Sequence, residues 1–150
     1  MTMILLDRVI ELRRALARAA PAAFTGDITA RQAAVLRELR ASGPASQVSL
    51  SRATAIDPSF MVRMLDDLEK RGLVRRKRSE TDRRQVTVSL TAAGTKALGP
   101  VNLAYERLAK AVEHDLTTEE RAAFLVIAGK MSRSLEALTA SSTEVRHGQR

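Results

Sequence analysis

The strongest constraint in this 150-residue sequence is a short segment with well-marked ends, from Asp57-Pro58 to Gly72. Aspartate can accept hydrogen bonds from the free amides at a helix start, and proline suits the first helical position because its missing N–H costs nothing there. Gly72 is a natural stop. The apolar residues between them have the i, i+3, i+4, i+7 spacing of one buried helix face: Met61, Met64, Leu65 and Leu68. The segment therefore predicts a helix with these residues pointing away from the core: Ser59, Phe60, Val62, Arg63 and Asp66.

A basic hairpin is predicted directly after this helix. The stretch RRKRSETDRRQVTVSL holds six basic and two acidic side chains, a net charge of +4 and half of the chain's formal +8. Its apolar/polar alternation predicts two strands, 73–78 and 85–90, joined by the loop SETDRR. In the second strand Val86, Val88 and Leu90 are expected to face inward. Positive charge concentrated on a narrow hairpin favours a polyanionic partner.

Three helical segments precede the capped helix. The first, residues 4–20, has a helical apolar stripe and is expected to end at Pro21. The second starts at Thr29, whose spacing to Gln32 is that of a capping box, and the third is short, residues 46–54. The stripe of the first helix consists of Leu5, Val9, Leu12 and Leu16. The second helix is expected to bury Ala33, Leu36 and Leu39, and the third offers Val48 and Leu50 as candidate buried contacts.

A long helical region follows the hairpin. It begins at Thr91, and Pro100 inside it predicts a kink or a late helix start. Thr117 and Glu120 have capping-box spacing for a last helix, and the polar residues 140–150 predict a disordered tail. The apolar seams expected along these helices are Leu98, Val101, Tyr105, Leu108 and Val112, followed by Phe124, Ile127, Met131, Leu135 and Leu138.

Composition narrows the classes of function. The sequence contains no cysteine, which excludes disulfides, thiolate metal sites and thiol-based redox sensing. Apolar residues make up 45% of the chain but aromatic residues only 3%, so an aliphatic core is expected, which suits helices. The apolar runs are far shorter than the ~20 residues of a membrane span, and the N-terminus lacks a signal-peptide cleavage pattern. The expected compartment is therefore the cytoplasm.

No catalytic or metal-binding set stands out in the sequence. The two histidines, His114 and His147, are far apart, and neither a glycine-rich phosphate loop nor a Ser/His/Asp arrangement is visible. Asp66, Asp67 and Glu69 lie on the capped helix, and acids beside a polyanion suit control of shape better than catalysis. We therefore expect no enzyme activity, no metal and no cofactor.

Short helices, a capped helix and a basic hairpin in this order describe a winged helix-turn-helix, in which one helix enters the major groove of DNA and the hairpin reaches the minor groove. The telling segments are LDDLEKRGLVRRKR (65–78) and DRRQVTVSLTAAG (82–94), with ITARQAAVL (28–36) and IDPSFMVRMLDDLEKRG (56–72) in support. On these segments the sequence resembles the MarR family of bacterial winged-helix transcription regulators. D-x-R followed by an alternating strand and L-T-x-x-G is a fairly specific signature.

The resemblance implies a mostly helical fold with a small β-hairpin, in which a winged helix-turn-helix lobe joins a helical dimerisation region. Residues 1–24 then form an N-terminal dimerisation helix, 28–96 the DNA-binding lobe and 97–139 the C-terminal dimerisation helices. The family implies a homodimer that binds a pseudo-palindromic site in double-stranded DNA, typically as a repressor. It also implies a small aromatic or anionic effector that binds between the two regions and releases the DNA.

The resemblance also assigns residues to DNA. Arg84 follows Asp82 by two residues and matches the family's wing arginine, so we expect it in the minor groove. Asp82 is expected either to hold the loop's shape or to serve as a plain turn former. Outward Phe60 and Val62 are unusual for the family; they would touch thymine methyls, unless the helix is rotated and Phe60 joins the core. Phosphate contacts are expected from Arg76, Lys77, Arg78 and Arg83. The other candidate DNA-binding residues are Ser46, Gln47, Ser59 and Arg63.

The sequence leaves several alternatives open. The outer helices could form a monomeric bundle against the lobe, although a two-fold dimer would bury each apolar stripe against its own copy. The basic surface also fits an architectural DNA-binding protein without sequence preference, or a winged-helix module that binds an acidic protein. Ala55 replaces the glycine that often precedes Ile56 in related sequences, so the geometry of that turn is open as well.

Overall fold

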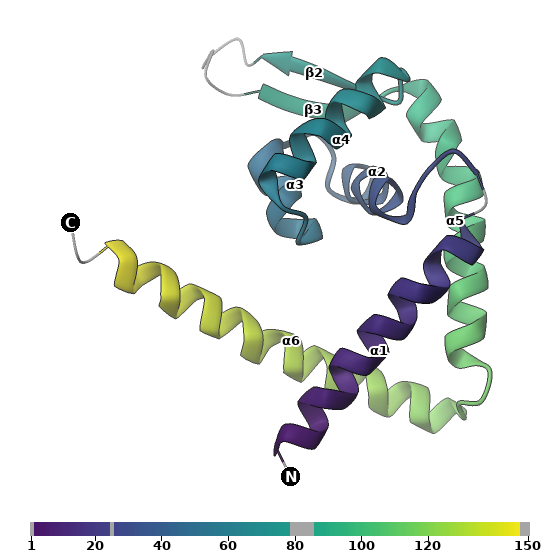
Figure 1. Ribbon diagram of the computed structural model, residues 1–150, viewed down its shortest axis with the longest axis vertical. Helices are drawn as coiled ribbons and strands as arrows, with labels where there is room; N and C mark the ends of the chain where they lie inside the picture. Colours follow the sequence, from purple (N-terminus) through teal and green to yellow (C-terminus); the bar gives the residue numbers. More distant parts are fainter. Residues whose placement is uncertain (1, 25, 79–85, 148–150) are drawn as a thin grey trace. The chain divides into compact units, whose positions relative to one another are not determined.

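The computed structural model describes residues 2–24, 26–78 and 86–147 (Figure 1). Contacts divide the chain into two compact units, Met1–Ala109 and Lys110–Arg150. The fold is mostly helical with one small antiparallel sheet, as predicted. Its elements are α1 (Thr2–Ala23), α2 (Ala30–Ser42), β1 (Ala45–Ser46), α3 (Gln47–Thr54), α4 (Pro58–Lys70), β2 (Val74–Arg78), β3 (Val86–Leu90), α5 (Ala92–Glu113) and α6 (Thr118–His147).

One aliphatic core holds the first unit together. The apolar face of α4 is buried as predicted, through Met61, Met64, Leu65 and Leu68. Side chains from α2, α3, β2, β3 and α5 complete the cluster: Ala33, Val35, Leu36, Leu39, Leu50, Val74, Val88, Leu98 and Val101. Because helices and strands share these contacts, α4 is fixed relative to the hairpin that follows it.

The start of α4 is capped as the sequence predicts. The Asp57 carboxylate accepts hydrogen bonds from the backbone N–H groups of Ser59 (2.9 Å) and Phe60 (3.2 Å), and Pro58 occupies the first turn. Beyond the helix, Gly72 adopts a left-handed φ of +68°, a conformation that favours glycine. The reciprocal bonds of a capping box are also present at the starts of α2 and α6.

The sheet has three strands in the order β1-β3-β2. The predicted hairpin is present, with Val74 opposite Leu90 and Arg78 opposite Val86. β1 was not predicted, because a strand of two residues is too short to show an alternating pattern. Val88 is buried as expected, whereas Val86 is 37% exposed, contrary to expectation, because it lies at the hairpin end away from the core cluster.

Two prolines lie inside helices, where the sequence suggested boundaries. The prediction that Pro21 ends α1 is wrong, since the helix continues to Ala23. The last turn tolerates the missing N–H because the N–H of Phe24 still donates to the carbonyl of Ala20 (3.0 Å). Pro100 likewise lies within α5, which begins well before it, so the late helix start is wrong as well.

Further differences concern exposure and the C-terminal end. Leu50 is buried as expected, but Val48 is 68% exposed, because it lies on the outer side of α3. α6 continues to His147 across the region in which a disordered tail is expected, and neither glycine nor proline interrupts residues 140–147. The expected boundary between the DNA-binding lobe and the dimerisation helices falls inside α5, which is one continuous helix.

The start of α5 gives a physical reason for the spacing L-T-x-x-G. The Thr91 hydroxyl donates to the carbonyl of Gly72 (2.6 Å) and accepts from the N–H of Gly94 (3.0 Å), which ties α5 to the turn before β2. A Cβ at position 94 would overlap the carbonyl oxygen of Leu73. Glycine is therefore required at this position by the close approach of two backbones.

We expect Gly94→Ala to destabilise the protein by about 1–3 kcal/mol, because the added methyl forces α5 away from Leu73. The matched variant is Gly129→Ala in α6, where a Cβ would meet only the flexible end of the Arg133 side chain, at an ordinary contact distance of 3.5 Å. That change should stabilise by up to about 1 kcal/mol, as alanine is the better helix former. Urea unfolding at equal protomer concentration measures both variants. Equal effects at the two sites would contradict the close approach.

Candidate nucleic-acid interface

The turn between α3 and α4 keeps a tight geometry without a glycine. Ala55 lies in the left-handed region, with φ 53° and ψ 30°, and the N–H of Ile56 donates to the carbonyl of Ser51 (3.2 Å). Such a conformation costs an L-residue roughly 1–2 kcal/mol, and here the surrounding core imposes it. The substitution of alanine for glycine therefore leaves the helix-turn-helix geometry intact.

The outward side of α4 divides into exposed and half-buried parts. Ser59, Val62 and Arg63 are exposed, as the helical spacing predicts. Phe60 is half-buried and packs against the core cluster, with the guanidinium groups of Arg31 and Arg63 near its ring. Of the two alternatives for Phe60, the structure therefore favours packing at the edge of the core.

Two candidate residues lie at the start of α3. Ser46 is the N-cap of this helix, and its hydroxyl accepts a hydrogen bond from the N–H of Ser49 (3.1 Å). Gln47 is the first helical residue and is half-buried. Free N–H groups at a helix start attract anions, which keeps a phosphate contact at this position as a prediction.

Arg76 attaches the wing to α4. Its Nη1 donates to Asp66 (2.5 Å) and to Glu69 (3.0 Å), and its Nη2 donates to the carbonyl of Val62 (3.3 Å). Its backbone N–H also donates to Glu69 (2.8 Å). The guanidinium of Arg76 is therefore engaged within the protein and positions the wing strand against the acids of α4. The phosphate contact that the sequence suggested for Arg76 stays a prediction.

The charges of this network are stabilised by their mutual contacts. The hydrogen bond from the backbone N–H of Arg76 lowers the pKa of Glu69 below its ordinary value, although burial acts in the opposite direction. Burial opposes the charge of Arg76, but hydrogen bonds to Asp66 and Glu69 outweigh it and raise the pKa of the guanidinium. Both partners therefore stay charged through the neutral pH range.

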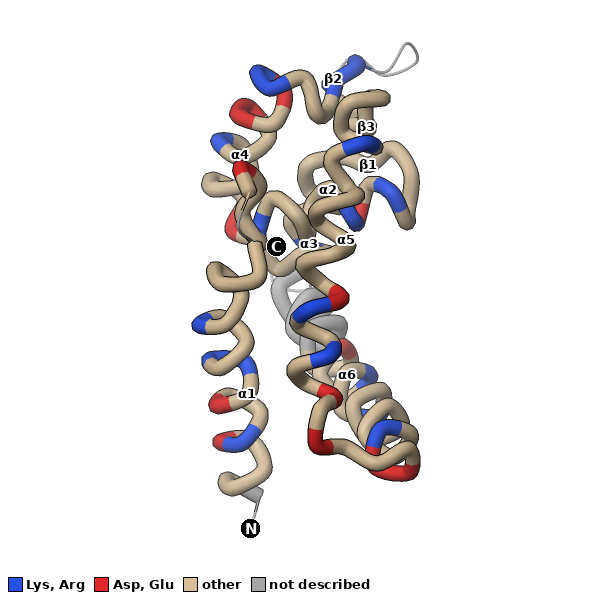
Figure 2. The backbone as a smooth tube through the Cα atoms, turned by 90° about the vertical axis from the view of Figure 1, so that its right-hand side faces the viewer, with Lys and Arg blue, Asp and Glu red and all other residues tan. Residues whose placement is uncertain are grey.

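The remaining wing residues differ in what the structure describes. Arg75, Lys77 and Arg78 are exposed on β2, and Figure 2 shows basic segments there beside the mixed charges of α4. The candidate residues Asp82, Arg83 and Arg84 lie outside the described residues, as does the first residue of the second predicted strand.

A second polar link joins α4 to α2. The Gln32 side-chain amide donates to Asp67 (2.8 Å), and Arg71 donates to the same carboxylate oxygen (3.4 Å). The capping spacing of Thr29 and Gln32 was visible in the sequence, but the contact with Asp67 was not, because 35 positions separate the partners. The contact of Arg31 with Phe60 was missed for the same reason.

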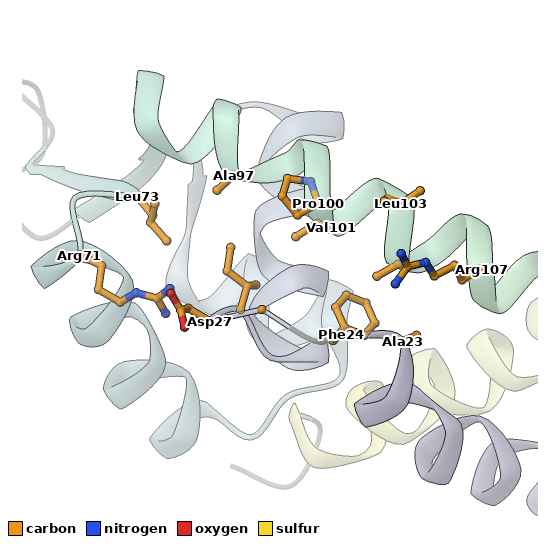
Figure 3. Close-up of a pocket in the computed structure, with 13 residues that line it drawn as sticks. Ala23, Phe24, Asp27, Arg71, Leu73, Ala97, Pro100, Val101, Leu103 and Arg107 are labelled. Carbon is orange, nitrogen blue, oxygen red and sulfur yellow. The ribbon is translucent and has the colours of Figure 1, made fainter.

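An apolar cavity of about 350 Å³ lies in the first unit, beside the winged lobe (Figure 3). Its walls come from the end of α1, the segment before α2, the turn after α4, and α5. Phe24 lines it, and its ring meets Tyr105 edge-on at 5.4 Å between centroids. In Figure 3, Arg71 and Asp27 lie at one end of the cavity and Arg107 at the other.

Neither a metal site nor a membrane span emerges from the described part of the chain. No group of three or more His, Asp or Glu side chains there is placed to hold a metal ion. None of the described helices combines the length and the apolar character that crossing a bilayer requires.

Comparisons with known proteins agree with this architecture. The model of the MarR family matches residues 28–86. The transcriptional repressor NicR of Pseudomonas putida is 33% identical over 109 residues, which cover 73% of this chain and 69% of NicR. The sequence similarity therefore extends well beyond the winged lobe.

Solved structures give the same result. BpsR of Bordetella bronchiseptica, described as regulated in its DNA binding by 6-hydroxynicotinic acid, is 31% identical with a TM-score of 0.72, over 83% of this chain and 98% of BpsR. A mutant of MarR from Escherichia coli, complexed with operator DNA, is 28% identical with a TM-score of 0.75, over 87% and 95% of the two chains. The winged lobe, its signature spacings and these relatives together establish that this chain belongs to the MarR family of DNA-binding transcription regulators.

Proposed function

We propose that the protein is a homodimeric repressor that binds a pseudo-palindromic operator and is released by a small aromatic carboxylate. The observation that supports the DNA-binding part best is the attachment of the basic wing to α4 through Arg76. It fixes the spacing between a helix that can enter the major groove and a hairpin that can reach the neighbouring minor groove. A fixed spacing of this kind suits the reading of one DNA geometry.

Arg84→Ala should weaken operator binding about tenfold and reduce the preference for A·T-rich flanks, because a narrow minor groove attracts an inserted arginine. Binding measured by fluorescence anisotropy on operators with A·T-rich and with G·C-rich flanks separates this effect from a general loss of charge. The oligomeric state should not change. Equal losses on both operators would make Arg84 an ordinary phosphate contact.

The same assay distinguishes a regulator from an architectural protein. A specific regulator prefers its operator to random duplex by at least ~10³-fold, whereas an architectural binder loses affinity for every duplex alike as salt rises. Operators selected from a random library would also report the symmetry and spacing of the half-sites.

Exposed apolar side chains support the homodimer. In the first unit, α1 leaves these residues between 38% and 62% exposed: Ile4, Leu5, Leu6, Val9, Leu12 and Leu16. In the second unit, α6 leaves a comparable stripe at least half exposed: Phe124, Ile127, Leu135 and Leu138. Stripes of this kind mark interfaces between protein chains, and a two-fold dimer can cover each with its own copy. By contrast, Leu98 and Val101 of the expected α5 seam are already buried in the lobe.

Ile127→Glu should shift the protein from dimer to monomer, because a carboxylate buried at the interface without a partner is strongly unfavourable. Ala122→Glu lies on the opposite side of α6 and serves as the matched control. Light scattering coupled to gel filtration, across protein concentrations, measures the mass. A monomeric wild-type protein would contradict the homodimer and support the bundle alternative.

The cavity beside the winged lobe supports the effector. Its lining is mostly apolar, with Phe24, Pro100 and Val101 among its residues, and Arg71 and Arg107 supply positive charge. A flat ring with one carboxylate fits this combination, and 6-hydroxynicotinic acid, the regulator of BpsR, has that chemistry. Since Arg71 also contacts Asp67 of α4, a carboxylate that attracts Arg71 would disturb the link between α2 and α4.

We expect 6-hydroxynicotinic acid to release the protein from its operator, and the corresponding amide to act at least tenfold more weakly, since it lacks the charge that the two arginines recognise. Ala97→Leu should abolish the response by filling the cavity while leaving DNA binding without effector unchanged. Calorimetry with free protein tests the binding directly. An unchanged response of Ala97→Leu would place the effector elsewhere.

A further inference from the structure

The ring of Phe60 lies close to the guanidinium groups of two arginines from different helices. The guanidinium carbon of Arg31, on α2, lies 5.2 Å from the ring centroid, and that of Arg63, on α4, lies 5.7 Å from it. Both distances are within the ~6 Å over which a cation is attracted to an aromatic ring. The ring packs against the core cluster, so the core determines its place. Both arginines are thereby held beside the N-terminal half of α4.

These two cations lack an acidic counterpart in the described part of the chain. The described ion pairs include neither Arg31 nor Arg63. Three acids at α4 have other contacts: Asp57 caps α4, Asp66 holds the wing strand, and Asp67 binds α2. An anion bound by both guanidinium groups would supply the counter-charge that the described ion pairs do not give them.

We propose that Arg31, Phe60 and Arg63 form a clamp for a phosphate of the DNA backbone at the edge of the major groove. The inference rests on the DNA-binding function and extends the contact surface to α2, beyond the recognition helix and the wing. Phe60 is a positioning residue in this clamp. It restricts the two guanidinium groups before DNA arrives, so less side-chain freedom is lost on binding.

The clamp also accounts for an aromatic residue at the edge of the core on α4. A ring at the edge of the core can bind cations on its exposed part while its buried part adds to packing. Arg31 and Arg63 therefore differ from Arg71 and Arg76, whose guanidinium groups are bound to carboxylates of α4. Arg71 and Arg76 thus bind other parts of the protein, whereas Arg31 and Arg63 can bind DNA.

Arg31→Gln tests the clamp, with Arg40→Gln as its control. Both residues are exposed on α2, both changes remove one charge, and Arg40 contacts no aromatic ring in the described structure. We expect Arg31→Gln to weaken operator binding about three- to tenfold and to reduce the slope of log affinity against log salt by about 0.9, the value for one phosphate. Arg40→Gln should change neither by more than about twofold. Equal behaviour of the two variants overturns the clamp.

Phe60→Leu tests the positioning role, with Phe60→Tyr as the variant that keeps the ring. The leucine variant should bind about two- to fivefold more weakly, the tyrosine variant normally, and thermal unfolding checks that both fold. In an Arg31→Gln/Arg63→Gln background, Phe60→Leu should have no further effect. A persistent loss there would make Phe60 a base contact and overturn the proposal. Wild-type protein without operator preference would instead refute the regulator function itself.

Discussion

The burial of one face of α4 is the constraint on which the rest of the lobe depends. That face lies in the aliphatic core through Met61, Met64, Leu65 and Leu68. All polar contacts of the α4 side chains are therefore made by the remaining surface of the helix. Its C-terminal half holds the wing through Arg76 and reaches α2 through Gln32. Its N-terminal half leaves Ser59, Val62 and Arg63 exposed. The side-chain contacts to the wing and to α2 therefore gather in one half of the helix.

Much of the winged lobe was predictable from the sequence, because interactions between nearby residues determine where its helices and strands begin and end. The cap at Asp57, the stop at Gly72 and the hairpin rest on contacts between residues close in sequence. The buried face of α4 was readable from the helical spacing of its apolar residues. Arg84 is the exception among the local predictions, since it lies outside the described residues. The family resemblance supplied what periodicity alone could not, namely the connection of this lobe to transcription regulation.

The sequence could not show contacts between residues that are distant along the chain. The ion pairs of Arg76 with Asp66 and Glu69, on another element, were not predicted, and the phosphate contact of Arg76 stays a prediction. The helical position of Phe60 fitted both a base contact and packing against the core. The structure adds a neighbour that the sequence did not predict, Arg31 of α2, beside the ring. The position of Pro21 misled for a different reason, since the last turn of α1 tolerates one missing backbone donor while the N–H of Phe24 still donates to Ala20.

The junction at Thr91 has a consequence for how motion can spread through the molecule. Thr91 ties the beginning of α5 to the turn that leads into β2, and the bare backbone at Gly94 lets the two segments touch. With no side chain between them to yield, a rotation of α5 must carry the base of the hairpin with it. In the proposed dimer, a rearrangement between subunits would then reach DNA as a change in the distance between the two winged lobes.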